Sequence, residues 1–401
     1  MTSPSADGDS SLPSIPGDAS ALFSDGYDTV FSRQTPPGKL NRGLRRTLLR
    51  ILGPAPFRAV RRLRNQTPEP VRPLSVDTLT GVLDALGIRH TVMPDRILIA
   101  WPTVRSELLL LSDNGGLHLV LRGRLRGRTG VEQLPLLQDA LSLGDERSLL
   151  VCFYPAVAAD ATLSVRFHTS LCVEAGISRT QLRTFLERAL VLVITGCLTL
   201  LDELPVLAGP RVDASELLRS DSVEATQPVE GIVIPPRVSK PVELSLPEPL
   251  DLYRLRLILE EVRGDAEPHP HYRALALRIN DVDIHVTVNT TTAAGPGDVI
   301  IIARWTVRWD GPPTDAFGEA AMACAAFDRR CPTVNVRAAL VGAPNTEPTS
   351  RDTERVIVCA VALFPASSGA TDAQLKSALE CGITGVVEAV TVIRKVLSDP
   401  I

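Results

Sequence analysis

Aromatic residues and lysine are both scarce in this chain of 401 residues. Aromatic side chains make up 4% of the sequence, and the only lysines are Lys39, Lys240, Lys376 and Lys395. The preference for arginine is typical of a GC-rich genome. Hydrophobic residues still make up 44% and charged residues 22%, which is the composition of a globular protein. A chain of this length is too long for one ordinary core and predicts two domains with tails.

Paired-cysteine motifs are absent from the sequence. No two cysteines have the spacing of a zinc knuckle or a CxxC redox pair, and the total of seven is odd. Most of the cysteines lie in apolar runs, where a free thiol behaves as a small hydrophobic group. We therefore expect a reducing compartment and no structural metal. The seven are Cys152, Cys172, Cys197, Cys324, Cys331, Cys359 and Cys381.

The chain also lacks a signal-peptide pattern and a run long enough to span a bilayer. Its first residues show no basic segment followed by an apolar one. The longest nearly apolar run covers residues 189–201, whereas a membrane helix needs about 20 residues. We interpret this run as a buried core helix and expect a cytoplasmic protein.

Catalytic signatures are missing as well. No nucleophile elbow, phosphate-binding loop or dinucleotide fingerprint occurs. His269 and His271 flank Pro270, whose extended backbone would let both rings reach one metal, but no nearby cysteine completes a site. A solvated loop is the simpler interpretation. The sequence thus predicts a protein that is not an enzyme and has no cofactor.

Residues 1–72 divide into a polar tail and a basic arm. The tail, residues 1–37, is rich in Ser, Pro, Gly and Asp and is predicted to be disordered. Phe23, Tyr27 and Phe31 interrupt it at helical spacing, which favours a segment folded back on a domain over a docking peptide. The arm, residues 38–72, carries +9 between positions 39 and 64, so the chain's net charge of −4 leaves −13 for the rest.

The arm combines arginines with leucines at helical spacing. A Gly-Pro-Ala-Pro sequence at 53–56 breaks it, so each part predicts a short amphipathic helix with an arginine face. The candidate partner or membrane surface consists of Arg42, Arg45, Arg46, Arg50, Arg58, Arg61, Arg62, Arg64, Leu44, Leu48 and Leu52. We rank a protein partner, or the chain's own acidic domains, first and an anionic membrane second. Nucleic acid ranks third, because the arm lacks interleaved aromatics apart from Phe57.

From residue 73 the pattern is that of an α+β domain. A helical stripe is followed by three extended segments at 96–101, 104–112 and 117–125, the last two joined by a strong turn at 113–116. A helix over about 131–143, strands at 149–155 and 161–173, and a long helix after Ser178 complete it. Gln181, three positions after Ser178, predicts a capping box. The order is helix, three strands, helix, two strands, helix, with an antiparallel sheet.

The same order recurs in residues 248–401, after a Pro-rich linker at 206–247. Matched positions of the two copies follow the same order along the chain. The difference between their residue numbers only increases, as expected if the second copy has longer loops. We therefore predict two copies of one domain, at 73–205 and 248–401. The matched pairs include Ile97 with Leu275, Arg122 with Arg304, Ser178 with Thr371, Gln181 with Gln374, and Leu186 with Leu379.

These residues resemble the YbjN family of bacterial domains, which share the fold of type III secretion chaperones. The resemblance is carried by VIIIARWTVRW, CAAFDRRCPTVNVRAAL and GATDAQLKSALECGITGVVEAV in the second copy, and more loosely by GLHLVLRGRL and GISRTQLRTFLERAL in the first. With the arginine preference it indicates an actinobacterial-type protein. The first copy departs from the family pattern because Asp145-Glu146-Arg147 is not followed by a proline such as Pro332.

The resemblance implies a regulatory or chaperone-like role without catalytic residues. Proteins of this fold commonly dimerise, so two fused copies are expected to pair within one chain, and a homodimer is the alternative. Our interpretation is a cytoplasmic adaptor or chaperone-like regulatory protein that binds a protein partner. The alternative is a peripheral membrane-associated factor that acts through the basic arm.

The predicted boundaries can be tested by limited proteolysis of the full chain. Exposed segments without a core are cut first, so early cleavage should fall within residues 1–72 and within the linker at 206–247. Mass spectrometry of the early products should then show two resistant fragments. First cuts inside residues 117–173 would contradict the boundaries.

Overall fold

The computed structural model describes residues 69–398, with gaps at 102, 114–115, 146–149, 159, 210–244, 265–266, 269–273, 290–296, 310–311 and 342–354. Every arginine and leucine of the candidate arm surface lies outside the described residues, as do His269 and His271. The predicted α+β class with antiparallel sheets is confirmed. Residues 69–209 are called the first half below, and residues 245–398 the second half.

The first half contains one antiparallel sheet and three α-helices. The strands are ordered β1-β2-β3-β4-β7-β5, and β6 also pairs with β7. The short strands β1 and β5 were not expected from the sequence. The elements are α4 (Val76–Ala85), β1 (His90–Val92), β2 (Ile97–Ala100), β3 (Val104–Asp113), β4 (Gly116–Leu125), β5 (Thr129–Gly130), η3 (Val131–Gln133), α5 (Leu134–Asp145), β6 (Cys152–Val157), β7 (Thr162–Cys172), α6 (Arg179–Glu203) and η4 (Pro205–Ala208).

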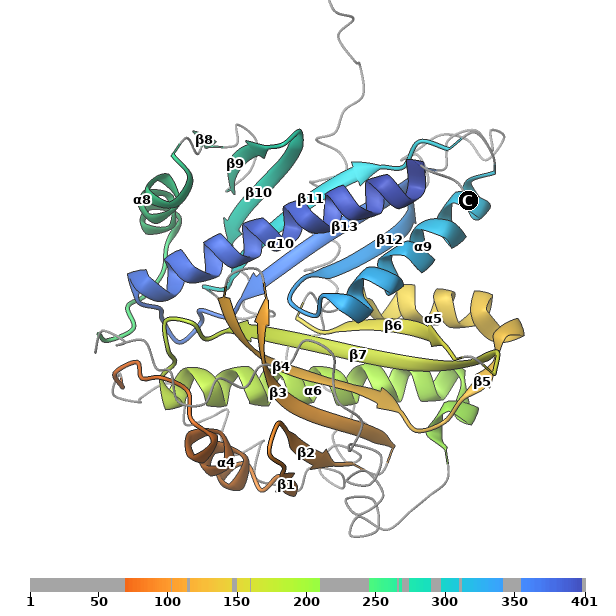
Figure 1. Cartoon of the computed structure of the whole chain (residues 1–401), viewed down its shortest axis with the longest axis horizontal. Helices are drawn as coiled ribbons and strands as arrows, with labels where there is room; N and C mark the ends of the chain where they lie inside the picture. The colour runs from red at the N-terminus through yellow and green to blue at the C-terminus, as the bar shows by residue number, and fades with distance from the viewer. Residues whose placement is uncertain are drawn as a thin grey trace, which may run out of the picture.

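The second half contains a second antiparallel sheet and three further α-helices. Its strands are ordered β8-β9-β10-β11-β13-β12. In Figure 1, α10 lies across β11 and β13, and α6 runs along the sheet of the first half. The elements are α8 (Leu252–Arg263), β8 (Glu267–Pro268), β9 (Ala274–Ile279), β10 (Val282–Val288), β11 (Val299–Thr306), α9 (Pro313–Arg330), β12 (Asn335–Val341), β13 (Arg355–Phe364) and α10 (Asp372–Ser398).

Local sequence signals account for the ends of several elements. The Ser178 hydroxyl accepts a hydrogen bond from the main-chain N–H of Gln181, whose side chain accepts one from the Ser178 N–H, so the predicted capping box is confirmed. Asp113 pairs with Gly116 at the end of the β3–β4 ladder, as the predicted turn requires. Asp251 caps α8 by accepting from the N–H of Arg254.

Apolar side chains from both halves form one connected core. It contains Phe167 and Phe185 of the first half and Ile301 and Val386 of the second, each at most 1% exposed. The expectation that no apolar run is long enough to span a bilayer needs correction, because the whole helix α6 is long and apolar enough by length and composition. In the structure its buried side, including Leu186 and Val193, packs into this core, as predicted for residues 189–201.

Two predicted boundaries fall inside packed structure. The linker was expected to begin at residue 206, but η4 continues to Ala208, because the Leu207 side chain is fully buried. The Leu207 carbonyl also accepts a hydrogen bond from the N–H of Gly127 at 2.9 Å. At the other end, Val71 was assigned to the arm but is fully buried. The folded part of the first half therefore extends beyond 73–205 on both sides.

Candidate functional site

The starts of the two longest helices, α6 and α10, meet through a reciprocal pair of glutamines. The Gln181 Nε2 donates to the Gln374 Oε1, and the Gln374 Nε2 donates to the Gln181 Oε1, both at 3.1 Å. Each Nε2 also donates at 2.8 Å to a carbonyl of the opposite half, at Gly369 for Gln181 and at Gly176 for Gln374. Both side chains are buried. Each half thus satisfies polar groups that the other half buries.

The glycines that receive these hydrogen bonds have matching backbone conformations. Gly176 has a φ of 82° and Gly369 a φ of 84°, a region that L side chains rarely adopt. An added Cβ would lie 2.7 Å from the Arg72 carbonyl oxygen at Gly176 and 2.9 Å from the Glu248 carbonyl oxygen at Gly369. These two positions therefore require glycine for conformation and for space.

An ion pair crosses the same contact further along α6. The Arg188 guanidinium donates to both carboxylate oxygens of Asp298, at 3.1 and 2.6 Å. Asp298 is fully buried, and burial raises the pKa of its carboxyl group against the opposing effect of Arg188. Removing one partner alone would leave the other charge without compensation in a buried setting.

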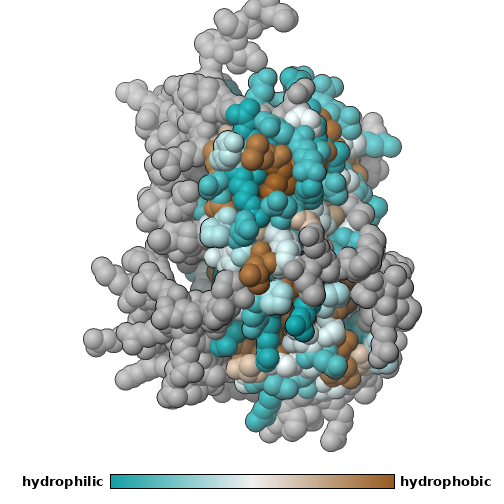
Figure 2. Space-filling view, turned by 90° about the vertical axis from the view of Figure 1, so that its left-hand side faces the viewer, coloured by the Kyte–Doolittle hydropathy of each residue, from teal (hydrophilic) through white to brown (hydrophobic). Residues whose placement is uncertain are grey.

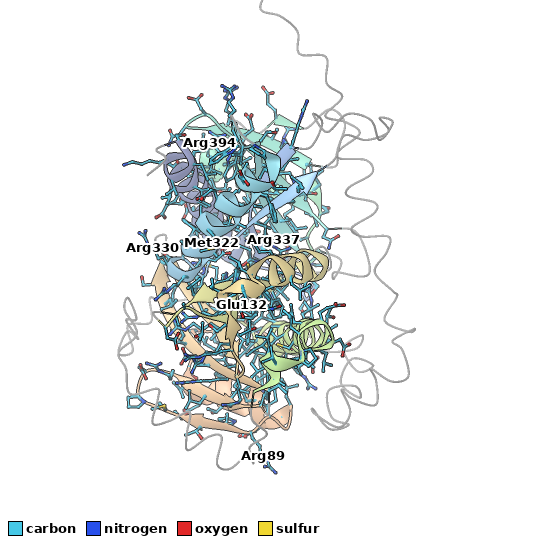
Figure 3. The ribbon with its side chains drawn as sticks, turned by 90° about the vertical axis from the view of Figure 1, so that its right-hand side faces the viewer. Arg89, Glu132, Met322, Arg330, Arg337 and Arg394 are labelled. Carbon is cyan, nitrogen blue, oxygen red and sulfur yellow. The ribbon has the colours of Figure 1, made fainter. Side chains whose placement is uncertain are left out.

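A further polar contact joins the end of β3 to the segment before β12. The Asp113 carboxylate accepts from the Thr333 hydroxyl at 2.8 Å and from the Cys331 thiol at 3.3 Å. Burial raises the pKa of the Cys331 thiol to about 12, so this thiol stays protonated at neutral pH. Another hydrogen bond between the halves runs from the Arg337 guanidinium of β12 to the Val151 carbonyl at 3.3 Å. Figure 3 shows Arg337 and Met322 close to the boundary between the halves, far from Arg89 and Arg394.

One cluster of metal-ligating residue types lies where α10 meets the ends of β4 and β7. His118, Cys172 and Cys381 place their potential ligand atoms within 4.8 Å of one another. They line a cavity of about 20 Å³, large enough for one water molecule or an ion. Burial lowers the pKa of His118 to about 4 against the opposing effect of Asp113, whose main-chain contact leaves at least one ring nitrogen without a hydrogen-bond partner among the described residues.

A second cluster consists of Cys152, His168 and Asp328, each 1% exposed. The Cys152 thiol donates to Asp328 at 3.3 Å, and the carboxylate also accepts from the Val336 N–H at 3.0 Å. Burial lowers the pKa of His168 to about 4. The Tyr154 ring lies 5.6 Å from the His168 ring, and burial raises the pKa of its phenol.

The charged groups around His168 include two arginines. Arg122 and Arg337 both lower the pKa of the His168 ring, whereas the Asn335 side chain and the Val334 main chain raise it by hydrogen bonding. The surroundings of His168 therefore combine burial with the positive charge of two arginines, which disfavours a protonated ring.

Sequence reasoning did not find these clusters. Cys152 and Asp328 lie 176 positions apart, and Gln181 and Gln374 lie 193 apart, so no local spacing rule applies. Cys172 and Cys381 were interpreted as scattered small hydrophobic residues. A usable signal existed only for the glutamines, which had been matched with each other as helix-start residues.

Comparison with known proteins does not assign the chain to a family. No family model matches the chain, and no curated protein matches it. Among solved structures, the chain is similar to the crystal structure of "YbjN, a putative transcription regulator from E. coli", with 20% identity and a TM-score of 0.28. The match covers 33% of this chain and 93% of that one. At this level the likeness assigns neither family nor activity, and the YbjN resemblance stays a prediction.

Replacing either glutamine of the reciprocal pair should destabilise the whole chain. Gln374→Ala leaves the Gly176 carbonyl and the Thr371 N–H without their partners, which should cost about 1–3 kcal/mol of unfolding free energy. In denaturant unfolding, the double variant Gln181→Ala/Gln374→Ala should lose less unfolding free energy than the two single variants lose together, because the two amides share hydrogen bonds. The control Gln133→Ala, on a partly exposed turn, should stay within about 0.5 kcal/mol. Additive losses would contradict the coupling.

The buried His168 should make the stability of the metal-free chain depend on pH. Its pKa is lowered, so the unfolded chain takes up this proton near pH 6.5 and the folded chain only near pH 4. The free energy of unfolding should therefore fall between pH 6.5 and 4, by up to about 3 kcal/mol for this group. The free energy of unfolding, measured with urea at several pH values, should change less with pH in His168→Gln than in the wild type or the control His90→Gln. An equal pH dependence in all three proteins would contradict the assignment to His168.

Proposed function

We propose that this chain is a non-enzymatic regulatory or adaptor protein in which two copies of one domain pair with each other and present a basic arm to a protein partner. The reciprocal hydrogen bonds between Gln181 and Gln374 carry this proposal. In a symmetric dimer, the same surface is used on both sides and a residue near the axis contacts its own equivalent. Two matched residues of one chain make such a contact here.

Further matched features support the two-copy proposal. The strand order β1-β2-β3-β4-β7 is repeated as β8-β9-β10-β11-β13, with β6 and β12 in equivalent places beside β7 and β13. An antiparallel bridge before each long helix joins Arg72 to Ile177 and Glu248 to Ala370. Each long helix also begins with a hydroxyl residue followed three positions later by the glutamine.

The root of the arm supports a docking role close to this contact. Val71 is fully buried, and Arg72 exchanges two backbone hydrogen bonds with Ile177, just before α6. The arm therefore leaves the folded part near the meeting point of α6 and α10. Each exposed arginine pair contributes only about 0–1 kcal/mol, so binding through the arm must be collective and screened by salt.

Deletion of residues 38–64 should abolish partner association and leave thermal unfolding nearly unchanged. Association would be measured by cross-linking and affinity capture from the native cell, and by sedimentation with anionic vesicles. Arginine substitutions should weaken capture mostly at low salt. Replacing Leu44, Leu48 and Leu52 should weaken it at every salt concentration, because each buried leucine contributes roughly 1.5–3 kcal/mol.

Deletion of residues 5–31 is a length-matched control without basic residues. It should retain capture, and losing capture in this control would assign docking to the aromatic series of the tail instead. If the protein sediments with anionic vesicles only when the arm is present, the partner of the arm is a membrane surface and not a protein. If arm deletion lowers the unfolding temperature by several degrees, the arm is part of a domain and the docking proposal is wrong.

A further inference from the structure

We propose that His118, Cys172 and Cys381 bind one zinc ion that joins the two halves of the chain. The three residues come from β4, β7 and α10, so the first half supplies two ligands and the second half supplies one. This site goes beyond the proposed adaptor function and does not depend on the arm.

The donor set fits zinc in chemistry and in size. Two thiolates and one imidazole are preferred zinc ligands, and two thiolates neutralise the charge of Zn²⁺. Tetrahedral zinc with these ligands requires donor atoms roughly 3.5–3.8 Å apart, and because the donor atoms lie within 4.8 Å of one another, a contraction of at most about 1 Å is needed. The cavity of about 20 Å³ has room for the ion itself.

The His118 ring is buried and has a ring nitrogen available for a metal ion. The side chain is 5% exposed, and its main-chain contact with Asp113 leaves at least one of the two ring nitrogens without a hydrogen-bond partner among the described residues. A buried polar group without a partner costs free energy, which metal coordination would recover. Asp113 and Glu174 act on the ring with negative charge, which also favours a cation at this place.

The two thiols lie beside each other and beside a hydroxyl group. The Cys172 sulfur lies 3.5 Å from the Ser377 hydroxyl oxygen, and the sulfurs of Cys172 and Cys381 lie within 4.8 Å of each other and of a His118 ring nitrogen. Cys172 is only partly buried, which leaves a route for the ion. The place of Cys381 depends on Gly116, where an added Cβ would lie 2.3 Å from the Cys381 sulfur.

The cluster of Cys152, His168 and Asp328 is the weaker candidate. It offers one thiol instead of two, and that thiol is already hydrogen-bonded to the carboxylate. Arg122 and Arg337 surround its histidine with positive charge, whereas the charges near His118 are negative. Electrostatics therefore favours the site at Cys381.

Zinc titration of the reduced full chain against a chromophoric chelator tests the proposal. One equivalent should bind, and Co²⁺ in its place should give sulfur-to-cobalt charge-transfer absorption. Cys172→Ser and Cys381→Ser should each weaken binding by roughly 100-fold or more, since loss of a direct ligand costs at least as much as loss of a supporting residue. The matched control Cys359→Ser, a partly buried cysteine outside both clusters, should bind like the wild type.

Zinc X-ray absorption of the wild type keeps the test independent of whether a variant folds. Two sulfur ligands and one imidazole are expected, together with a higher unfolding temperature in the presence of zinc. Absence of binding, a zinc shell without sulfur, or binding that Cys152→Ser abolishes and Cys381→Ser does not would overturn the proposal.

Discussion

The hydrogen-bonding requirement of two buried glutamine amides constrains how the two described halves of the chain are arranged. A buried amide without partners costs free energy, and neither Gln181 nor Gln374 finds all its partners within its own half. Each amide reaches a glycine carbonyl of the opposite half, and each glycine takes a left-handed conformation next to a backbone bridge. The two sheets, the two helix starts and the root of the arm are thereby fixed relative to one another.

The contact between the halves is matched in backbone but not in chemistry. Seven residues after its glutamine, α6 places Arg188 against the buried carboxylate of Asp298. At the same step, α10 places Cys381 against Gly116, whose missing Cβ leaves space for the sulfur. The bidentate ion pair fills the space at Arg188 of α6, whereas a cavity remains beside His118 at Cys381 of α10. The same packing can therefore hold a salt bridge on one side and a metal site on the other.

The surface gives less information than the contact between the halves. On the face drawn in Figure 2, apolar atoms form separate small patches between hydrophilic ones. Tyr253 and Leu257 of α8 are among the exposed large side chains, but scattered exposed apolar residues are normal on a soluble surface. The proposed docking of the arm therefore rests on the charge and leucine pattern of its sequence.

The sequence by itself determined the α+β class, the hairpin from Asp113 to Gly116 and the capping box of α6, because each depends on residues near one another in the chain. It also paired Gln181 with Gln374 as equivalent positions. Only the tertiary structure decided that these amides bond to each other, and that Cys381 lies beside His118. Such contacts join the two halves of the chain, and they are set by packing of the shared core, which leaves no local pattern in the sequence.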